Sequence, residues 1–222
     1  MRQDFQAIIF DMDGVIIDSE TRWQKKELTF FEQFADQWTS ADQQAITGSS
    51  IHDIYGYISK KYPLSLSEAE FFKEYDQTAQ AVYGQETQLL PGVIDLLRQI
   101  KDSSLSIALA SSSPHSWINI VLDRFNLRGF FKTVISSDDV QSKGKPAPDI
   151  YLFTAKKLKL KPQKCLVIED SINGVKAAKA AGMTCIWLKP EAKLTKQKVK
   201  ADKIVSSHQQ IAQYLAKSVT VK

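Results

Sequence analysis

The sequence predicts an α/β fold: a doubly wound parallel-sheet (Rossmann-like) core with an inserted all-helical domain, the cap. First, residues 7–10 form an apolar run without alternation, which is typical of a strand buried on both faces of a parallel sheet. Second, strand-like and helix-like segments alternate from Pro91 onward, as in βα units. Third, the segment between these two regions has only helical periodicity.

The segment after the first strand is expected to be entirely helical. Its apolar residues recur at three- and four-residue intervals, as on a helix with a broad buried stripe. The expected helices are residues 21–38, 41–47, 51–60 and 66–83. We assign residues 19–86 to the cap and residues 1–18 and 87–222 to the core. This insertion point lets the cap close over the end of the sheet where the first strand stops.

The core elements follow in alternation. The expected strands are residues 106–110, 133–135, 165–168, 184–188 and 203–205. The expected helices are residues 91–100, 114–125, 149–158, 172–181 and 209–217, with Asp149 as a candidate cap of its helix.

Asp11 and Asp13 leave the sheet at the carboxyl end of the first strand, where open α/β sheets bind ligands. An Asp-x-Asp-Gly run commonly forms a turn in which Asp bonds the local backbone. Here the preceding strand is buried, and a pair of charges at the edge of a core costs free energy unless a cation or hydrogen-bond donors compensate it. We therefore expect Asp11 to attack an electrophile and Asp13 to act as general acid and base, beside a cation that prefers oxygen ligands.

Two further segments carry candidate groups at strand ends. Ser111 and Ser112 follow the strand at residues 106–110, where a hydroxyl and neighbouring amides can bind a phosphoryl oxygen. A serine run before a helix is also an ordinary cap and turn. Lys145 lies in a Lys-Pro-x-Pro-Asp run whose prolines fix the local backbone, so this lysine is a positioned charge, and Lys143 does not fit that register.

Glu169 and Asp170 are adjacent acids at the end of an apolar strand. Capping by Asp170 or Ser171 is the simpler interpretation of an isolated Glu-Asp-Ser. Two acids opposite the Asp11 and Asp13 pair repel one another unless a cation is present. Magnesium suits this set because it prefers oxygen ligands and keeps room for waters and a substrate phosphate.

Together these motifs resemble those of the haloacid-dehalogenase-like phosphohydrolases and phosphomutases. The resemblance covers essentially the whole chain and is greatest to members with a small helical cap, such as β-phosphoglucomutases and phosphoglycolate phosphatases. It implies that Asp11 becomes phosphorylated and that Lys145 pairs with both Asp11 and the transferring group. It also implies that Ser111 binds phosphate, that Asp170 is the stronger and Glu169 the weaker Mg²⁺ ligand, and that Asp13 ligates through its backbone carbonyl.

The implied function is a magnesium-dependent phosphatase that hydrolyses a small phosphate monoester, such as a sugar phosphate, through an aspartyl phosphate. The alternative is a β-phosphoglucomutase-type mutase. Those mutases carry a cap histidine and a cap arginine where this chain has Trp23 and the run Ser50-Ile51-His52. Arg22 and His52 lie near those positions, so this alternative stays open.

Two other classes of protein remain to be considered, a basic nucleic-acid-binding protein and a phospho-accepting domain that is not an enzyme. The formal net charge is +4, and a solvated lysine-rich face explains it better than a nucleic-acid site, since interleaved aromatics and arginines are absent there. The lysines concerned are Lys193, Lys196, Lys198, Lys200 and Lys203. A receiver-type phospho-accepting domain, which is not catalytic, is a further alternative, but such domains lack a helical insert after the first strand.

The expected setting is a reducing one. Cys165 and Cys185 lie within apolar strand-like runs and are interpreted as packed thiols. No apolar run reaches the length of a membrane span, and the N-terminus does not resemble a signal peptide. We expect a monomeric, cytoplasmic enzyme whose partner is a small phosphorylated metabolite and neither nucleic acid nor membrane.

Overall fold

The computed structural model describes residues 4–33, 38–140, 144–189 and 200–218. The described strands form one six-stranded parallel sheet in the order β3-β2-β1-β4-β5-β6. Their bounds are β1 (Ala7–Phe10), β2 (Ser106–Ala110), β3 (Thr133–Ile135), β4 (Cys165–Glu169), β5 (Thr184–Leu188) and β6 (Lys203–Val205). The predicted fold class is confirmed.

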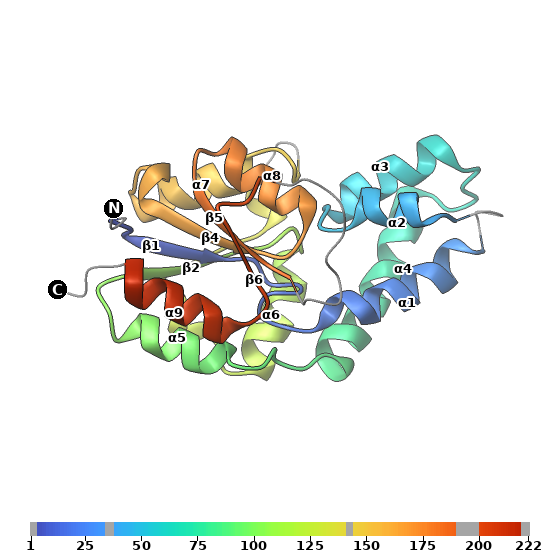
Figure 1. The fold of residues 1–222 in the computed structure, drawn as a ribbon. Helices are drawn as coiled ribbons and strands as arrows, with labels where there is room; N and C mark the ends of the chain where they lie inside the picture. The colour runs from blue at the N-terminus through green and yellow to red at the C-terminus, as the bar shows by residue number, and fades with distance from the viewer. Residues whose placement is uncertain (1–3, 34–37, 141–143, 190–199, 219–222) are drawn as a thin grey trace.

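Helices cover both faces of this sheet (Figure 1). Side chains of β1 alternate between two hydrophobic clusters: Ile8 and Phe10 pack on one face, Ala7 and Ile9 on the other. All four are completely buried, which explains the unbroken apolar run. The core helices are α5 (Val93–Lys101), α6 (His115–Arg124), α7 (Asp149–Leu158), α8 (Ile172–Ala180) and α9 (His208–Ser218). The first cluster includes residues of α5, α6 and α9, and the second includes residues of α7 and α8.

Among the described residues, four α-helices follow β1 and lie to one side of the sheet (Figure 1). They are α1 (Ser19–Phe31), α2 (Ser40–Ile46), α3 (Ile51–Lys61) and α4 (Glu68–Ala81), and α4 continues as a π-helical turn, η1 (Val82–Glu86). Where the chain leaves and re-enters the core, Asp18 N donates to Gln88 O at 3.0 Å and Leu90 N to Ile16 O at 2.9 Å. The two linkers thus run side by side, while the domain bounds at residues 18/19 and 86/87 stay a prediction.

Polar side chains cap the N-termini of α2 and α4. Thr39 and Ser67 form capping boxes with Asp42 and Glu70. Asp42 is completely buried, and its carboxylate also accepts hydrogen bonds from Tyr57 at 2.5 Å and from Tyr62 at 2.8 Å. These contacts fix α2 against α3.

Two local predictions were wrong. The first helix ends at Phe31 and does not reach Trp38; Trp38 instead packs back on Phe31 with ring centroids 4.2 Å apart, so its apolar character reflects burial outside the helix. Asp149 is the first residue of α7, and Pro148 holds the cap position with no side-chain hydrogen bond. Proline before the helix already restricts the backbone there.

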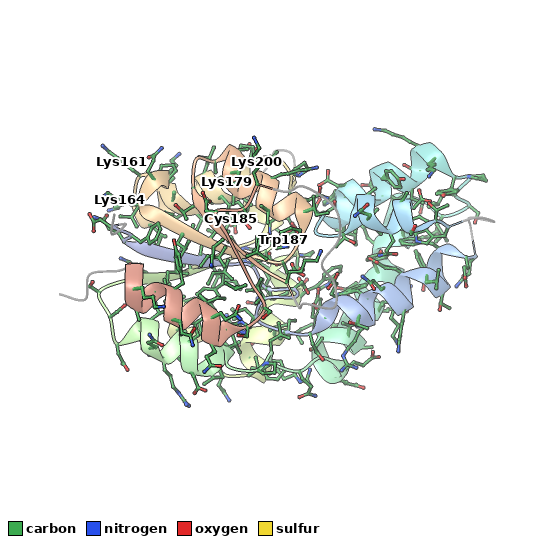
Figure 2. The ribbon with its side chains drawn as sticks, viewed as in Figure 1. Lys161, Lys164, Lys179, Cys185, Trp187 and Lys200 are labelled. Carbon is green, nitrogen blue, oxygen red and sulfur yellow. The ribbon has the colours of Figure 1, made fainter. Side chains whose placement is uncertain are left out.

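The two cysteines are buried, whereas Lys200 lies at the surface. Neither cysteine forms a disulfide with another described residue, and Figure 2 labels Cys185 and Trp187 of β5 together with Lys161, Lys164, Lys179 and Lys200. Lys200 is exposed, in keeping with a solvated face, whereas Lys143, Lys193, Lys196 and Lys198 lie outside the described residues. No described helix has the length and hydropathy that a membrane span requires.

Candidate active site

The carboxyl ends of β1, β2 and β4 meet because β1 pairs with both neighbours in parallel register. Phe10 lies opposite Leu109 of β2 and Ile168 of β4. The residues that follow these strands therefore gather at one edge of the sheet. This places Asp11 and Asp13, the serine run 111–113, and the pair Glu169 and Asp170 in one site.

Lys145 joins two of these acids. Its Nζ lies 2.6 Å from Asp11 Oδ1 and 2.6 Å from Glu169 Oε1, and the lysine is only 4% exposed. Burial raises the pKa of Asp11 to about 8, against the opposing attraction of Lys145. The attraction of the two carboxylates outweighs burial for the lysine and raises its pKa above the usual value. Lys145 therefore remains a cation in the site.

Glu169 is held by donors on both carboxylate oxygens. Besides Lys145, Tyr151 Oη donates to Oε1 at 2.7 Å. Oε2 accepts from the backbone N of Asp170 at 3.0 Å and from N and Oγ of Ser171, both at 3.1 Å. Burial disfavours the carboxylate, but Lys145 and these hydrogen bonds prevail and lower its pKa. Glu169 is thus a fixed anion.

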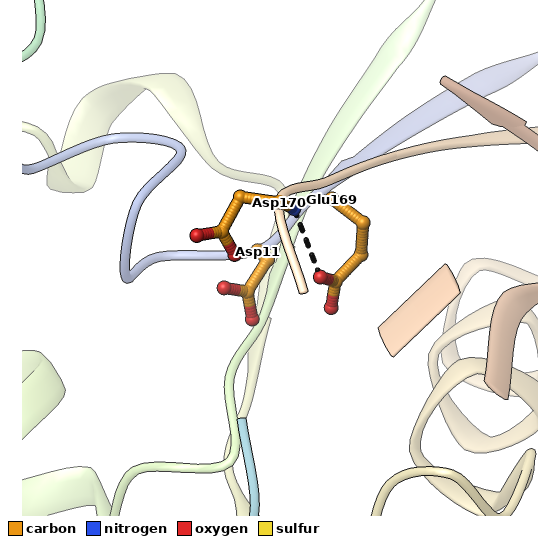
Figure 3. Close-up of side chains that lie close together, drawn as sticks. All are labelled: Asp11, Glu169 and Asp170. Carbon is orange, nitrogen blue, oxygen red and sulfur yellow. Dashed lines mark hydrogen bonds between the residues drawn. The ribbon is translucent and has the colours of Figure 1, made fainter. Parts of the chain in front are cut away.

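Asp11, Glu169 and Asp170 each offer one carboxylate oxygen, and these oxygens lie within 4.8 Å of one another (Figure 3). Burial and then the negative charges of Glu169 and Asp11 raise the pKa of Asp170 well above its usual value. The repulsion is what a bound cation would relieve, so the donor set fits a hard divalent ion. Gly14 (φ +70°) allows this approach, because a Cβ there would lie 1.9 Å from Asp170 Oδ2.

Asp13 has partners that the sequence analysis missed. Its Oδ1 accepts from Ser19 Oγ at 2.5 Å and Tyr83 Oη at 2.9 Å, and its Oδ2 from Ser113 Oγ at 3.2 Å. Burial raises the pKa of Asp13, and these three hydrogen bonds oppose the shift. Ser19 and Ser113 adjoin motifs visible in the sequence. Tyr83 lies 70 residues away at the end of the cap, and no pattern in the sequence indicates the contact.

The serines at positions 111–113 make different contacts. Ser111 is buried, and its Oγ accepts from Ser113 N at 3.1 Å. Ser112 Oγ donates to Gly48 O, in the cap, at 2.9 Å. Ser112 and Ser113 line the cavity described below, whereas Ser111 is not among its lining residues. Phosphate binding by Ser111 and Ser112 stays a prediction.

Comparisons with known proteins agree with this geometry. Residues 8–188 match the family of haloacid dehalogenase-like hydrolases. The chain belongs to this family. It is 34% identical over 204 residues to hexitol phosphatase B of Escherichia coli K12, covering 90% of this chain and 91% of that protein. It is 31% identical over 182 residues to a phosphorylated carbohydrates phosphatase of Thermotoga maritima, covering 82% of this chain and 84% of that protein.

Two solved structures share the fold. A structure described as a putative β-phosphoglucomutase from Thermotoga maritima superimposes with a TM-score of 0.70 at 28% identity, covering 96% of this chain and 99% of that one. CbbY from Rhodobacter sphaeroides with bound phosphate superimposes with a TM-score of 0.77 at 24% identity, covering 93% and 96%. The predicted family and the prediction of an enzyme of the hydrolase class are confirmed.

A cavity between the sheet edge and the cap helices holds the site of this hydrolase. Its core side includes Asp11, Asp13, Lys145 and Asp170. Its cap side includes Trp23, Glu27, Gln43, Ile46, Ile51, Ile54 and Tyr75. The cavity therefore has the acids of the sheet edge at one end and cap side chains at the other.

We expect Gly174→Ala to damage the site. A Cβ at Gly174 in α8 would lie 1.8 Å from Glu169 Oε1, so Glu169 or the helix must move, at a cost of about 1–3 kcal/mol in unfolding free energy. The matched control is Gly56→Ala in α3, where a Cβ meets nothing within 4 Å and where we expect stability to rise by up to about 1 kcal/mol. Denaturant unfolding of both variants measures this; equal effects would contradict the packing described here.

We also expect the stability of the protein to depend on pH through Glu27. Burial raises the pKa of Glu27 from 4.5 to about 7, so the folded state binds this proton more tightly than the unfolded state. The resulting stabilisation is complete below about pH 4.5 and is lost as the pH rises through about 7. The unfolding free energy of Glu27→Gln relative to wild type should rise across this range, by at most about 3 kcal/mol. A pH-independent difference would contradict the burial of an ionisable Glu27.

Proposed function

We propose that this hydrolase is a phosphatase that cleaves a small phosphate monoester, a sugar phosphate or similar, through an aspartyl phosphate on Asp11. The observation that carries the proposal is the buried Lys145, bound at 2.6 Å by both Asp11 and Glu169 beside the acidic Asp170. Such a site pairs a positioned carboxylate with fixed positive charge, as phosphoryl transfer requires. The phosphatase names of the relatives support the same assignment.

The proposed cycle has two steps. A carboxylate oxygen of Asp11 attacks phosphorus, the bond from phosphorus to the ester oxygen breaks, and Asp13 donates a proton to the departing alkoxide. Asp13 then takes a proton from water, which attacks the aspartyl phosphate and releases inorganic phosphate. Lys145 balances the charge on the phosphoryl oxygens in both steps. Ser111 and Ser112, with nearby amides, are the proposed phosphate-binding groups.

We propose that Mg²⁺ is held by the carboxylates of Asp11 and Asp170, with the backbone carbonyl of Asp13 and, more weakly, Glu169. When bound, Mg²⁺ withdraws charge from the phosphoryl oxygens. The acidic donor set fits the ion, since burial and then the negative charges of Glu169 and Asp11 raise the pKa of Asp170, and a cation would relieve that repulsion. Glu169 is the weaker ligand because donors already engage both of its oxygens.

We propose that the phosphoryl group is transferred to water and not to a sugar hydroxyl, because of where two cap residues lie. Arg22 Nη2 lies 3.1 Å from Asp18 Oδ2, and His52 faces Glu68 at 3.5 Å with 67% of its side chain exposed. Neither residue lines the cavity, so neither provides the second phosphate contact that a mutase needs. We further propose a monomeric, cytoplasmic enzyme that acts on a phosphorylated metabolite.

We expect Asp11→Asn to lower phosphate release by at least about a thousandfold, because an amide does not replace the nucleophile. The measurement is free phosphate released from p-nitrophenyl phosphate and from a panel of sugar phosphates, with Mg²⁺ and with a chelator. Asp95→Asn, a change at an exposed acid of α5, is the control and should behave as wild type. Turnover retained in the Asp11 variant would overturn the covalent mechanism.

We expect Tyr83 to position Asp13 for proton donation. Its Oη donates to Asp13 Oδ1 at 2.9 Å and accepts from Trp23 Nε1 at 2.9 Å, and Arg124 Nη1 binds its carbonyl oxygen at 2.8 Å. Tyr83→Phe removes a hydrogen bond to a charged group, which predicts about a tenfold fall in kcat on an alkyl phosphate.

The loss should be smaller on p-nitrophenyl phosphate, because nitrophenolate departs without a proton. Kinetics of both substrates, with kcat and KM determined separately, test this. Tyr55→Phe, which alters a cap tyrosine outside the cavity lining, is the control. An equal loss on both substrates would show that Tyr83 only supports the fold.

A further inference from the structure

The cap end of the cavity carries a carboxylate that the proposed cycle does not use. Glu27 of α1 and Gln43 of α2 both line the cavity, near the apolar side chains Ile46, Ile51 and Ile54. Glu27 is only 8% exposed. A buried carboxylate in such surroundings is costly unless it is well bonded, so its contacts indicate what it does.

One hydrogen bond to each carboxylate oxygen holds Glu27 in place, and each oxygen has room for a further donor. Its Oε1 accepts from Tyr75 Oη at 2.9 Å and its Oε2 from Gln43 Nε2 at 2.5 Å. Gln43 is itself fixed, because its Oε1 accepts from Trp38 Nε1 at 3.1 Å. A carboxylate offers about four lone-pair sites, so each oxygen can accept a further donor from a molecule in the cavity.

The position of Glu27 suits the distal end of a substrate. Ser19, Trp23 and Glu27 are spaced by four residues and share one face of α1. Ser19 Oγ lies 2.5 Å from Asp13 Oδ1, at the reacting end. The helix rises about 12 Å from Ser19 to Glu27, a span suited to a sugar or polyol chain and longer than a small phosphorylated acid.

The wall between these two ends is aromatic. Trp23 stacks on Tyr75 with centroids 5.3 Å apart and lies 5.6 Å from Trp117. Such rings cover the apolar C–H surface of a carbohydrate. The carboxylate of Glu27 at the end of this wall is placed for hydroxyl groups.

The charges of the cavity oppose a second anionic group. Among the described lining residues, the only cation is Lys145, which is paired with Asp11 and Glu169. The lining acids are Asp11, Asp13, Glu20, Glu27 and Asp170. A second phosphate or a carboxylate at the cap end would face Glu27 without a described counter-charge, whereas hydroxyl donors would bind to it.

We propose that Glu27 selects the leaving group: it accepts hydrogen bonds from hydroxyls of an uncharged polyol or sugar and rejects leaving groups that carry a second phosphate or a carboxylate. The inference rests on the proposed phosphatase function. It adds to that function a specificity residue in the cap and a chemical class of substrate.

The test compares wild type with Glu27→Gln on three kinds of ester at a pH well above the pKa of about 7 that burial gives Glu27, so that Glu27 is ionised. These are sorbitol 6-phosphate and glucose 6-phosphate, with neutral hydroxylated leaving groups; p-nitrophenyl phosphate, without hydroxyls; and phosphoglycolate and fructose 1,6-bisphosphate, with a second anion. Wild type should favour the first kind over the third by at least about tenfold in kcat/KM. In Glu27→Gln, kcat/KM should fall at least about tenfold on the first kind and less than about twofold on p-nitrophenyl phosphate. The ratio of kcat/KM between the first and third kinds should therefore be smaller than in wild type.

Glu32→Gln makes the same change at an exposed residue just after α1 and should match wild type on every ester. An equal loss of Glu27→Gln on p-nitrophenyl phosphate would assign Glu27 a structural role and overturn the inference. A wild-type preference for phosphoglycolate or the bisphosphate would overturn it without any variant. Failure of wild type to hydrolyse any ester, p-nitrophenyl phosphate included, would instead contradict the proposed phosphatase function.

Discussion

The buried ion pairs of Lys145 with Asp11 and Glu169 are the interaction on which the rest of the site depends. Parallel pairing of β1 with β2 and β4 brings several acids to one sheet edge, and burial makes their charges costly. Lys145 compensates only part of this charge. Tyr151 and the backbone amides fix Glu169, and Asp170 is left with the repulsion that a metal ion would relieve. Stability and chemistry are therefore coupled at this edge.

The cap is connected to the same chemistry through Asp13. Its carboxylate is bonded by Ser19 at the start of α1, by Tyr83 in the π-helical turn after α4, and by Ser113 of the core. π-helical turns are uncommon and occur often at functional sites. Because α1 and η1 each place a donor on Asp13, a movement of the cap changes the surroundings of the proposed acid and base. Contacts such as Ser112 Oγ to Gly48 O join the two parts directly.

The sequence was sufficient for the features that depend on local pattern. The unbroken apolar run before Asp11, the alternation after Pro91 and the acids at strand ends predicted the sheet and the edge where the acids gather. It was insufficient where distant segments meet. Tyr83 and Glu27 belong to an ordinary amphipathic pattern, and their contacts with Asp13 and Gln43 arise only from helix packing. Trp38 was placed in a helix for the same reason, since periodicity does not distinguish a helical stripe from a residue that folds back onto it.

The central claim is that Asp11 itself receives the phosphoryl group. The direct measurement is acid quenching of the enzyme during turnover of a phosphate monoester with Mg²⁺, followed by peptide mapping of the phosphorylated residue by mass spectrometry. The account predicts an acid-stable, hydroxylamine-sensitive phosphoryl group on Asp11 and none on Asp13. Phosphate release during a single turnover with no phosphorylated Asp11, under conditions where a synthetic aspartyl phosphate survives the quench, would contradict it.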